Sequence, residues 1–152
     1  MKKLTTIAAV LLAAFSHAQA TNVNIGVNHR SVQVEVEREE QIFYYKAQVE
    51  YNFVEEYRNI GFGIGYNGFV DRWRNTRFFL GGKLGLISHD DQGLAGNATF
   101  GAETGISFRF SDNISIGPKF VADWREDLKF YGVNYEPSLK GSAFLTLTII
   151  MD

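Results

Sequence analysis

The sequence predicts an all-β fold: an eight-stranded antiparallel transmembrane β-barrel of the outer-membrane type that follows an N-terminal signal peptide. Three observations predict it. The chain begins with an export signal, eight later segments alternate apolar with polar residues, and the polar face of these segments is dense in charge. An outer-membrane barrel has this pattern because its apolar side chains face lipid and its polar side chains face the lumen.

The first twenty residues have the three parts of a secretory signal peptide. Two lysines are followed by the apolar run 7–15 and by the small-x-small cleavage pattern at 18–20. This apolar run is too short to span a bilayer as a helix. We expect residues 1–20 to be removed and residues 21–152 to form one outer-membrane β-barrel domain. An uncleaved membrane anchor is the alternative.

Composition excludes several classes of protein. The 132 residues that remain after removal of 20 from 152 suit a single domain. The chain has no cysteine, which excludes a disulfide scaffold and a cysteine metal site. After loss of two lysines, 13 basic residues face 17 acidic ones, a net charge of −4 that gives no reason to expect nucleic-acid binding. No motif indicates a cofactor or a metal site, and we expect neither.

Alternation is clearest in residues 42–53, where successive side chains of a strand would point to opposite faces. One face carries Phe43, Tyr45, Ala47, Val49, Tyr51 and Phe53, and the other carries Tyr44, Lys46, Gln48, Glu50 and Asn52. Seven further segments repeat the pattern: 22–28, 31–37, 60–66, 77–86, 98–109, 114–125 and 138–149. An open sheet edge would leave backbone groups unpaired in lipid, so the first and last strands are expected to pair.

The polar face separates a membrane barrel from a soluble one, because a soluble barrel turns its apolar face inward. Eight strands leave a lumen just wide enough to be filled by side chains. We therefore predict a network of ion pairs in the lumen, and a narrow polar pathway for small solutes remains the alternative. The predicted network consists of Glu35, Glu37, Lys46, Glu50, Arg77, Lys83, Glu103, Arg109, Lys119, Asp123, Arg125 and Lys140.

Aromatic residues near the strand ends predict the girdles that outer-membrane barrels place at both interfaces. The tight turn at 111–113 is placed in the periplasm together with both termini, and so are the turns at 39–41 and 69–75. The outer loops are then 28–30, 54–58, 88–95 and 126–136. The periplasmic girdle is predicted from Phe43, Tyr45, Tyr66, Phe78, Phe108 and Phe110, and the outer girdle from Tyr51, Phe53 and Trp124.

One pair of residues suggests catalysis. His29 and Ser31 form a His-x-Ser pair, which is similar to the motif of lipid A deacylases, outer-membrane barrels that also use a glutamate. On this alternative His29 is the base, Ser31 the nucleophile, and Glu35 or Glu37 the orienting acid. A match of two residues is weak, so an exposed turn is the favoured interpretation and we expect no enzymatic activity.

Several stretches of the chain resemble one known group. The runs FLGGKLGL at 79–86, FGAETG at 100–105, FSDNISIG at 110–117 and DWREDL at 123–128 resemble the YfaZ-like outer-membrane proteins of Gram-negative bacteria. The resemblance covers mainly residues 60–128. It implies the location and the fold, and it supplies no functional residues. The chain ends on Asp152 rather than on the aromatic residue with which outer-membrane barrels usually end.

Together these patterns predict a non-enzymatic, monomeric barrel in the bacterial outer membrane, with a structural role or a surface-interaction role carried by its outer loops. Its expected partners are outer-membrane lipids and, during biogenesis, the outer-membrane assembly machinery. Two alternatives remain open. The first is a lipid A-modifying hydrolase, and the second is a soluble periplasmic β-barrel that binds a small apolar ligand.

Overall fold

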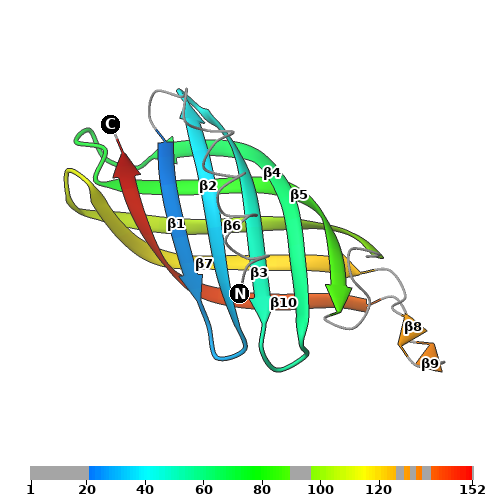
Figure 1. Ribbon diagram of the computed structural model, residues 1–152. Helices are drawn as coiled ribbons and strands as arrows, with labels where there is room; N and C mark the ends of the chain where they lie inside the picture. The colour runs from blue at the N-terminus through cyan, green and yellow to red at the C-terminus, as the bar shows by residue number, and fades with distance from the viewer. Residues whose placement is uncertain (1–20, 90–96, 126–128, 131–132, 135–137, 152) are drawn as a thin grey trace.

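The computed structural model describes residues 21–89, 97–125, 129–130, 133–134 and 138–151. Eight long strands close into a barrel in the order β1-β10-β7-β6-β5-β4-β3-β2 (Figure 1). These strands are β1 (Thr21–Val27), β2 (Ser31–Glu40), β3 (Phe43–Asn52), β4 (Tyr57–Phe69), β5 (Thr76–His89), β6 (Asn97–Ser111), β7 (Ile114–Arg125) and β10 (Ser138–Met151). Within the described ranges, no helix is long and apolar enough to cross a membrane.

All neighbouring strands of the barrel are antiparallel, and the first pairs with the last. The register of β1 with β10 runs from Thr21 opposite Met151 to Val27 opposite Leu145. Closure removes the sheet edge, which would leave a row of backbone groups unpaired in lipid. The eight-stranded antiparallel barrel predicted from the sequence is confirmed.

The connection between β7 and β10 contains an element that the sequence did not predict. A short antiparallel pair forms there from β8 (Lys129–Phe130) and β9 (Val133–Asn134), where a loop at 126–136 was expected. Two-residue strands are too short to show alternation, which explains why the pattern missed them. The predicted signal peptide, most of the predicted loop 88–95 and part of the predicted loop 126–136 lie outside the described residues.

The barrel has two distinguishable ends. Thr21, Met151 and the connections 41–42, 70–75 and 112–113 lie at one end, which we call the terminal end (Figure 1). The connections 28–30 and 53–56 lie at the opposite end, called here the loop end, together with β8 and β9 (Figure 1). This arrangement is the one that antiparallel pairing of eight strands imposes.

The two faces of the sheet differ sharply in what they expose. On β2, Gln33 is 0% exposed, whereas its neighbours Val32 and Val34 are 40% and 42% exposed. A water-soluble protein has the opposite distribution, with its valines inside and its polar side chains outside. The polar face therefore lines the lumen and the apolar face is the outer surface, as in a transmembrane barrel. These faces are the reverse of those that the soluble-barrel alternative requires.

All nine residues predicted for the aromatic girdles lie on the outer surface. Toward the terminal end, the Tyr66 ring lies 6.4 Å from Phe43 and 6.2 Å from Phe78, so three adjacent strands carry neighbouring rings. Toward the loop end, Trp124 stacks on Phe100 at 6.3 Å. Rings at both ends suit the headgroup regions of a bilayer, where amphipathic aromatic side chains are stable.

Candidate functional site

Two long side chains of β3 cross the lumen and meet the same carboxylate on β6. The Tyr44 hydroxyl donates to Glu103 at 2.7 Å, and the Lys46 ammonium donates to the other oxygen of Glu103 at 2.5 Å. Glycines on the intervening strands make room for this crossing. A Cβ at Gly65 would lie 2.5 Å from the Tyr44 ring, and a Cβ at Gly81 would overlap the Tyr44 hydroxyl.

A second connection crosses the other side of the lumen. Lys119 of β7 donates to Glu35 of β2 at 2.7 Å, and the same Glu35 oxygen accepts from Lys46 at 2.6 Å. We call Glu35, Lys46, Glu103 and Lys119 the central network. Its two carboxylates and two ammonium groups come from four strands, and each side chain is at most 2% exposed. Buried charges are tolerated only when they are paired, so each member depends on the others.

Toward the terminal end, Arg77 organises a second layer of polar side chains. Its guanidinium lies 2.7 Å from Glu37 and 3.6 Å from Glu39, and it also donates to the side-chain oxygen of Asn67. The amide nitrogen of Asn67 in turn donates to Glu39 at 3.0 Å. Every charged group of this layer thus has a partner of opposite charge.

Toward the loop end, two further connections span the lumen. Lys83 of β5 pairs with Asp123 of β7 at 2.9 Å. Arg125 donates to the Tyr57 hydroxyl at 2.7 Å and lies over the Tyr57 ring at 4.6 Å. The hydroxyl of Tyr57 donates to Glu50 at 3.3 Å. Polar contacts therefore follow one another along most of the length of the barrel.

Of the twelve charged residues predicted to line the lumen, ten are buried there. The exceptions are Arg109 and Lys140, whose side chains are exposed near the terminal end and the loop end respectively. Neither pairs with a carboxylate among the described residues. They lie close to the ends of their strands, where the lumen opens to solvent and a charge needs no partner.

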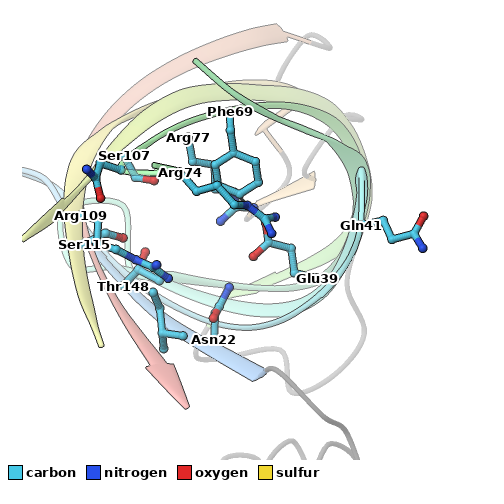
Figure 2. A pocket seen from close by; sticks show the side chains of 12 residues that line it. Asn22, Glu39, Gln41, Phe69, Arg74, Arg77, Ser107, Arg109, Ser115 and Thr148 are labelled. Carbon is cyan, nitrogen blue, oxygen red and sulfur yellow. Dashed lines mark ion pairs between the residues drawn. The ribbon is translucent and has the colours of Figure 1, made fainter. Parts of the chain in front are cut away.

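A vestibule lies at each end of the filled lumen. The terminal-end vestibule, shown in Figure 2, has a volume of about 380 Å³. The loop-end vestibule has a volume of about 280 Å³ and is lined in part by Arg30, Tyr57 and Arg125. The cavity beside the central network has a volume of about 20 Å³. This is room for about one water molecule, so the middle of the lumen is packed rather than open.

Several large lumen residues were not predicted as part of a site. Tyr44 already falls on the polar face of the alternating segment 42–53, so its inward direction was available from the sequence. Tyr57 was assigned to the loop 54–58, although β4 begins there. Phe144 is also buried, and its ring lies 5.4 Å from the Lys119 ammonium. Counting in steps of two along each strand would have identified all three, whatever their polarity.

The three residues of the hydrolase alternative are not joined to one another. Exposed His29 accepts a hydrogen bond from the Arg30 guanidinium at 3.1 Å, and the Ser31 hydroxyl contacts the Asn28 side-chain oxygen at 3.2 Å. Glu35 belongs to the central network. No base–nucleophile contact is therefore formed, although nucleophilic catalysis requires one. The absence of enzymatic activity stays a prediction.

Comparison with known proteins supports the fold. The chain is similar to a solved structure from the de novo design of transmembrane β-barrels, with a TM-score of 0.55, 13% identity and coverage of 87% of this chain and 93% of that one. Neisserial surface protein A gives a TM-score of 0.57 at 11% identity, covering 86% and 92% of the two chains. The outer membrane enzyme PagL gives 0.50 at 14% identity, covering 86% and 99%.

No protein-family model matches the sequence, and no curated protein matches it. Its closed eight-stranded barrel and the three similar structures give the protein the fold class of the small outer-membrane β-barrels. Sequence identities of 11–14% to these structures support a shared fold only. The YfaZ-like resemblance stays a prediction.

Proposed function

We propose that the protein is a monomeric, non-enzymatic barrel of the bacterial outer membrane whose lumen is closed and whose role is structural or is carried by its loop end. The central network supports this proposal best. It joins β2, β3, β6 and β7 across the lumen and leaves about 20 Å³ of free space beside it.

Solute passage would require these ion pairs to separate. Removing one partner from a buried ion pair costs about 3–5 kcal/mol, because the other charge is left in an environment of low dielectric. Two such pairs share Lys46, so opening a path beside it disturbs both Glu35 and Glu103. This argument favours a plugged barrel over a pore.

Connection lengths support an orientation with the terminal end in the periplasm and the loop end outside. At the terminal end the connections 41–42 and 112–113 have two residues each and 70–75 has six, whereas at the loop end the β7–β10 connection is long enough to contain β8 and β9. Outer-membrane barrels have short periplasmic turns and longer extracellular loops. The signal peptide predicted at residues 1–20 fits export across the inner membrane.

Two finer assignments complete the proposal. The order of motifs in residues 60–128 supports a YfaZ-like protein. The apolar outer surface and its aromatic rings support outer-membrane lipids as permanent partners. The outer-membrane assembly machinery is the proposed partner during biogenesis.

Conductance in planar lipid bilayers tests the closed lumen. The wild-type protein is expected to give no steady channel current. The double variant Lys46→Ala with Glu103→Ala shortens both side chains and is expected to raise the conductance. A current from this variant would show that the bilayer assay detects inserted protein. A steady wild-type current would contradict the proposal.

Surface labelling tests the orientation. The chain has no natural cysteine, so a single introduced thiol reports one position. A membrane-impermeant maleimide should label Val54→Cys at the loop end of intact cells. The matched variant Asp112→Cys, at the terminal end, should react only after the outer membrane is permeabilised. The reverse result would contradict the orientation.

A further inference from the structure

The terminal-end vestibule carries an excess of positive charge. Among the described residues that line it, Arg74, Arg77 and Arg109 are positive and Glu39 is negative, a balance of three minus one, or +2. Figure 2 shows these side chains around the open mouth of the barrel. The filled middle of the lumen differs, because the central network contains equal numbers of positive and negative groups.

Among the described residues, Glu39 is the one acid that lines this vestibule, and it is already engaged. Glu39 lies 3.6 Å from Arg77 and accepts a hydrogen bond from Asn67 at 3.0 Å. Arg77 is in turn held by Glu37 at 2.7 Å. Among the described residues, Arg74 and Arg109 have no carboxylate partner. Their two guanidinium groups therefore remain available for an anion.

Hydrogen bonds order the backbone at both arginines. The Asp71 carboxylate accepts N–H groups from Trp73 at 2.9 Å, Asn75 at 3.0 Å and Thr76 at 2.6 Å, which orders the connection that carries Arg74. The backbone N–H of Arg109 donates to the Asn75 carbonyl at 2.7 Å, so the two arginines are tied to one another through the backbone.

The arginine side chains also have defined surroundings. The Arg74 guanidinium lies over the Phe69 ring at 4.0 Å. The hydroxyls of Ser107, Ser115 and Thr148 line the same vestibule as Arg109, on the wall opposite Glu39 (Figure 2). Guanidinium groups accompanied by neutral hydroxyl donors form the donor set that suits phosphate oxygens. The ordered backbone at Arg74 and Arg109 reduces the entropy that is lost when an anion binds.

The described lining of the loop-end vestibule has the same formal balance, because Arg30, Arg125 and Lys140 are positive and Glu55 is negative. Its two arginines are placed differently, since both lie near Glu55, at 3.8 Å and 3.6 Å. An incoming anion would have to compete with that carboxylate for these arginines, and only the flexible Lys140 has no such partner. The terminal-end vestibule has no such competitor for Arg109 in the described part of the chain.

We propose that the terminal-end vestibule is a binding site for a phosphate group, with Arg109 and Arg74 as its charged ligands. Its volume of about 380 Å³ accommodates a phosphate with a small substituent. The group has two possible sources at the membrane surface: a soluble phosphate, or the headgroup of a phospholipid in the adjacent leaflet. The site is separate from the ion pairs that close the lumen, so the closed-lumen proposal and this one can fail independently.

Equilibrium dialysis with ³²P-labelled inorganic phosphate tests the site directly. The full chain is folded in dodecyl maltoside, which contains no phosphate, at a constant ionic strength set by potassium chloride. Wild-type protein is expected to bind one phosphate saturably. Arg109→Gln is expected to weaken binding about tenfold or more, because a charge-assisted hydrogen bond is lost.

Arg72→Gln is the matched control. Arg72 is an exposed arginine of the connection 70–75, which also carries Arg74, but it does not line the vestibule. It should leave phosphate binding unchanged. Absence of saturable binding to the wild-type protein would overturn the proposal. An equal loss of binding in Arg72→Gln and Arg109→Gln would also overturn it, because the effect would then depend on net charge alone.

A second arm distinguishes the two sources. The dialysis is repeated in mixed micelles that contain phosphatidic acid. Displacement of labelled phosphate from the wild-type protein assigns the site to a lipid headgroup. Undiminished binding of labelled phosphate assigns it to a soluble phosphate.

Discussion

The neighbouring strands β3 and β4 differ in the size of the side chains that they turn into the lumen. Along three successive inward positions, Tyr44, Lys46 and Gln48 of β3 lie opposite Gly65, Gly63 and Gly61 of β4. Each large side chain therefore faces a position without one. The lumen is filled because β3 supplies the volume and β4 supplies the space in which that volume lies.

This pairing explains how side chains on strands that are not neighbours come within hydrogen-bonding distance of one another. Lys46 lies flat against β4, and a Cβ at Gly63 would be 3.0 Å from its Cε. From there its ammonium reaches Glu103 on β6. Glycine in a strand usually marks close approach of another group, and here that group is a side chain from the adjacent strand.

The largest loss of stability is expected when the positive charge of Lys46 is removed from β3. Lys46→Met keeps most of the side-chain length but leaves Glu35 and Glu103 without their shared cation. We expect the free energy of unfolding to fall by about 3–5 kcal/mol, because the buried Glu103 loses its cation while Glu35 keeps Lys119. Urea unfolding of the folded protein in lipid or detergent measures this loss.

Lys140→Met is the control for that experiment, since Lys140 is exposed and pairs with no carboxylate of the described chain. Its effect should stay within about 0.5 kcal/mol. Equal effects of the two substitutions would show that the central network contributes no more than an exposed lysine.

The next largest effect is expected from filling the space opposite β3. Gly81→Ala on β5 places a methyl group against the Tyr44 hydroxyl and 2.8 Å from the Ile64 carbonyl oxygen. Overpacking of this kind costs about 1–3 kcal/mol, and the rigid ring favours the upper part of that range. The measurement is again urea unfolding.

Gly82→Ala provides a matched control one residue further along the same strand. Its methyl group would point to the outer surface, and the nearest atom, the Gly101 carbonyl oxygen, would be 3.8 Å away. We expect little or no loss of stability. A similar loss at both positions would mean that backbone flexibility, not the space for Tyr44, decides the outcome.

Removal of a single oxygen atom separates the contribution of packing from that of hydrogen bonding at Tyr44. Tyr44→Phe removes the hydrogen bond to Glu103, and a bond to a charged group contributes about 1.5–3 kcal/mol. The same change removes the atom that the new methyl group of Gly81→Ala would overlap. The double variant should therefore lose less stability than the sum of the two single variants. Additive losses would place the two side chains out of contact.

The barrel could be predicted from the sequence, whereas its internal packing could not. Alternation in segments such as 42–53 shows which residues point inward, because it depends only on strand geometry. It does not show that Tyr44 lies opposite Gly65, because strand register depends on turns and on closure. Arg109 was accordingly grouped with Lys119, although one is exposed in a vestibule and the other is buried in the central network.

The smallest expected effect concerns how β4 is held at its end. A strand with few inward side chains has little packing to order it, so its order depends more on backbone hydrogen bonds. Asp71 accepts three such bonds in the connection that follows β4. The pKa of the Asp71 carboxyl is lowered, chiefly by the backbone N–H of Asn75, because these donors favour the charged form.

A lowered pKa fixes the direction of the pH dependence. The stabilisation is fully present above the unfolded pKa of about 3.9, and it is lost as pH falls through the lower pKa of the folded protein. As the pH falls through the pKa of Asp71 in the folded protein, we expect the hydrogen-exchange protection factors of the Trp73, Asn75 and Thr76 amides to decrease. Amides in the middle of β3 should keep their protection. In Asp71→Asn the protection should not change with pH. Constant wild-type protection through this range would show that the connection is ordered by other contacts, and that β4 needs no support at this end.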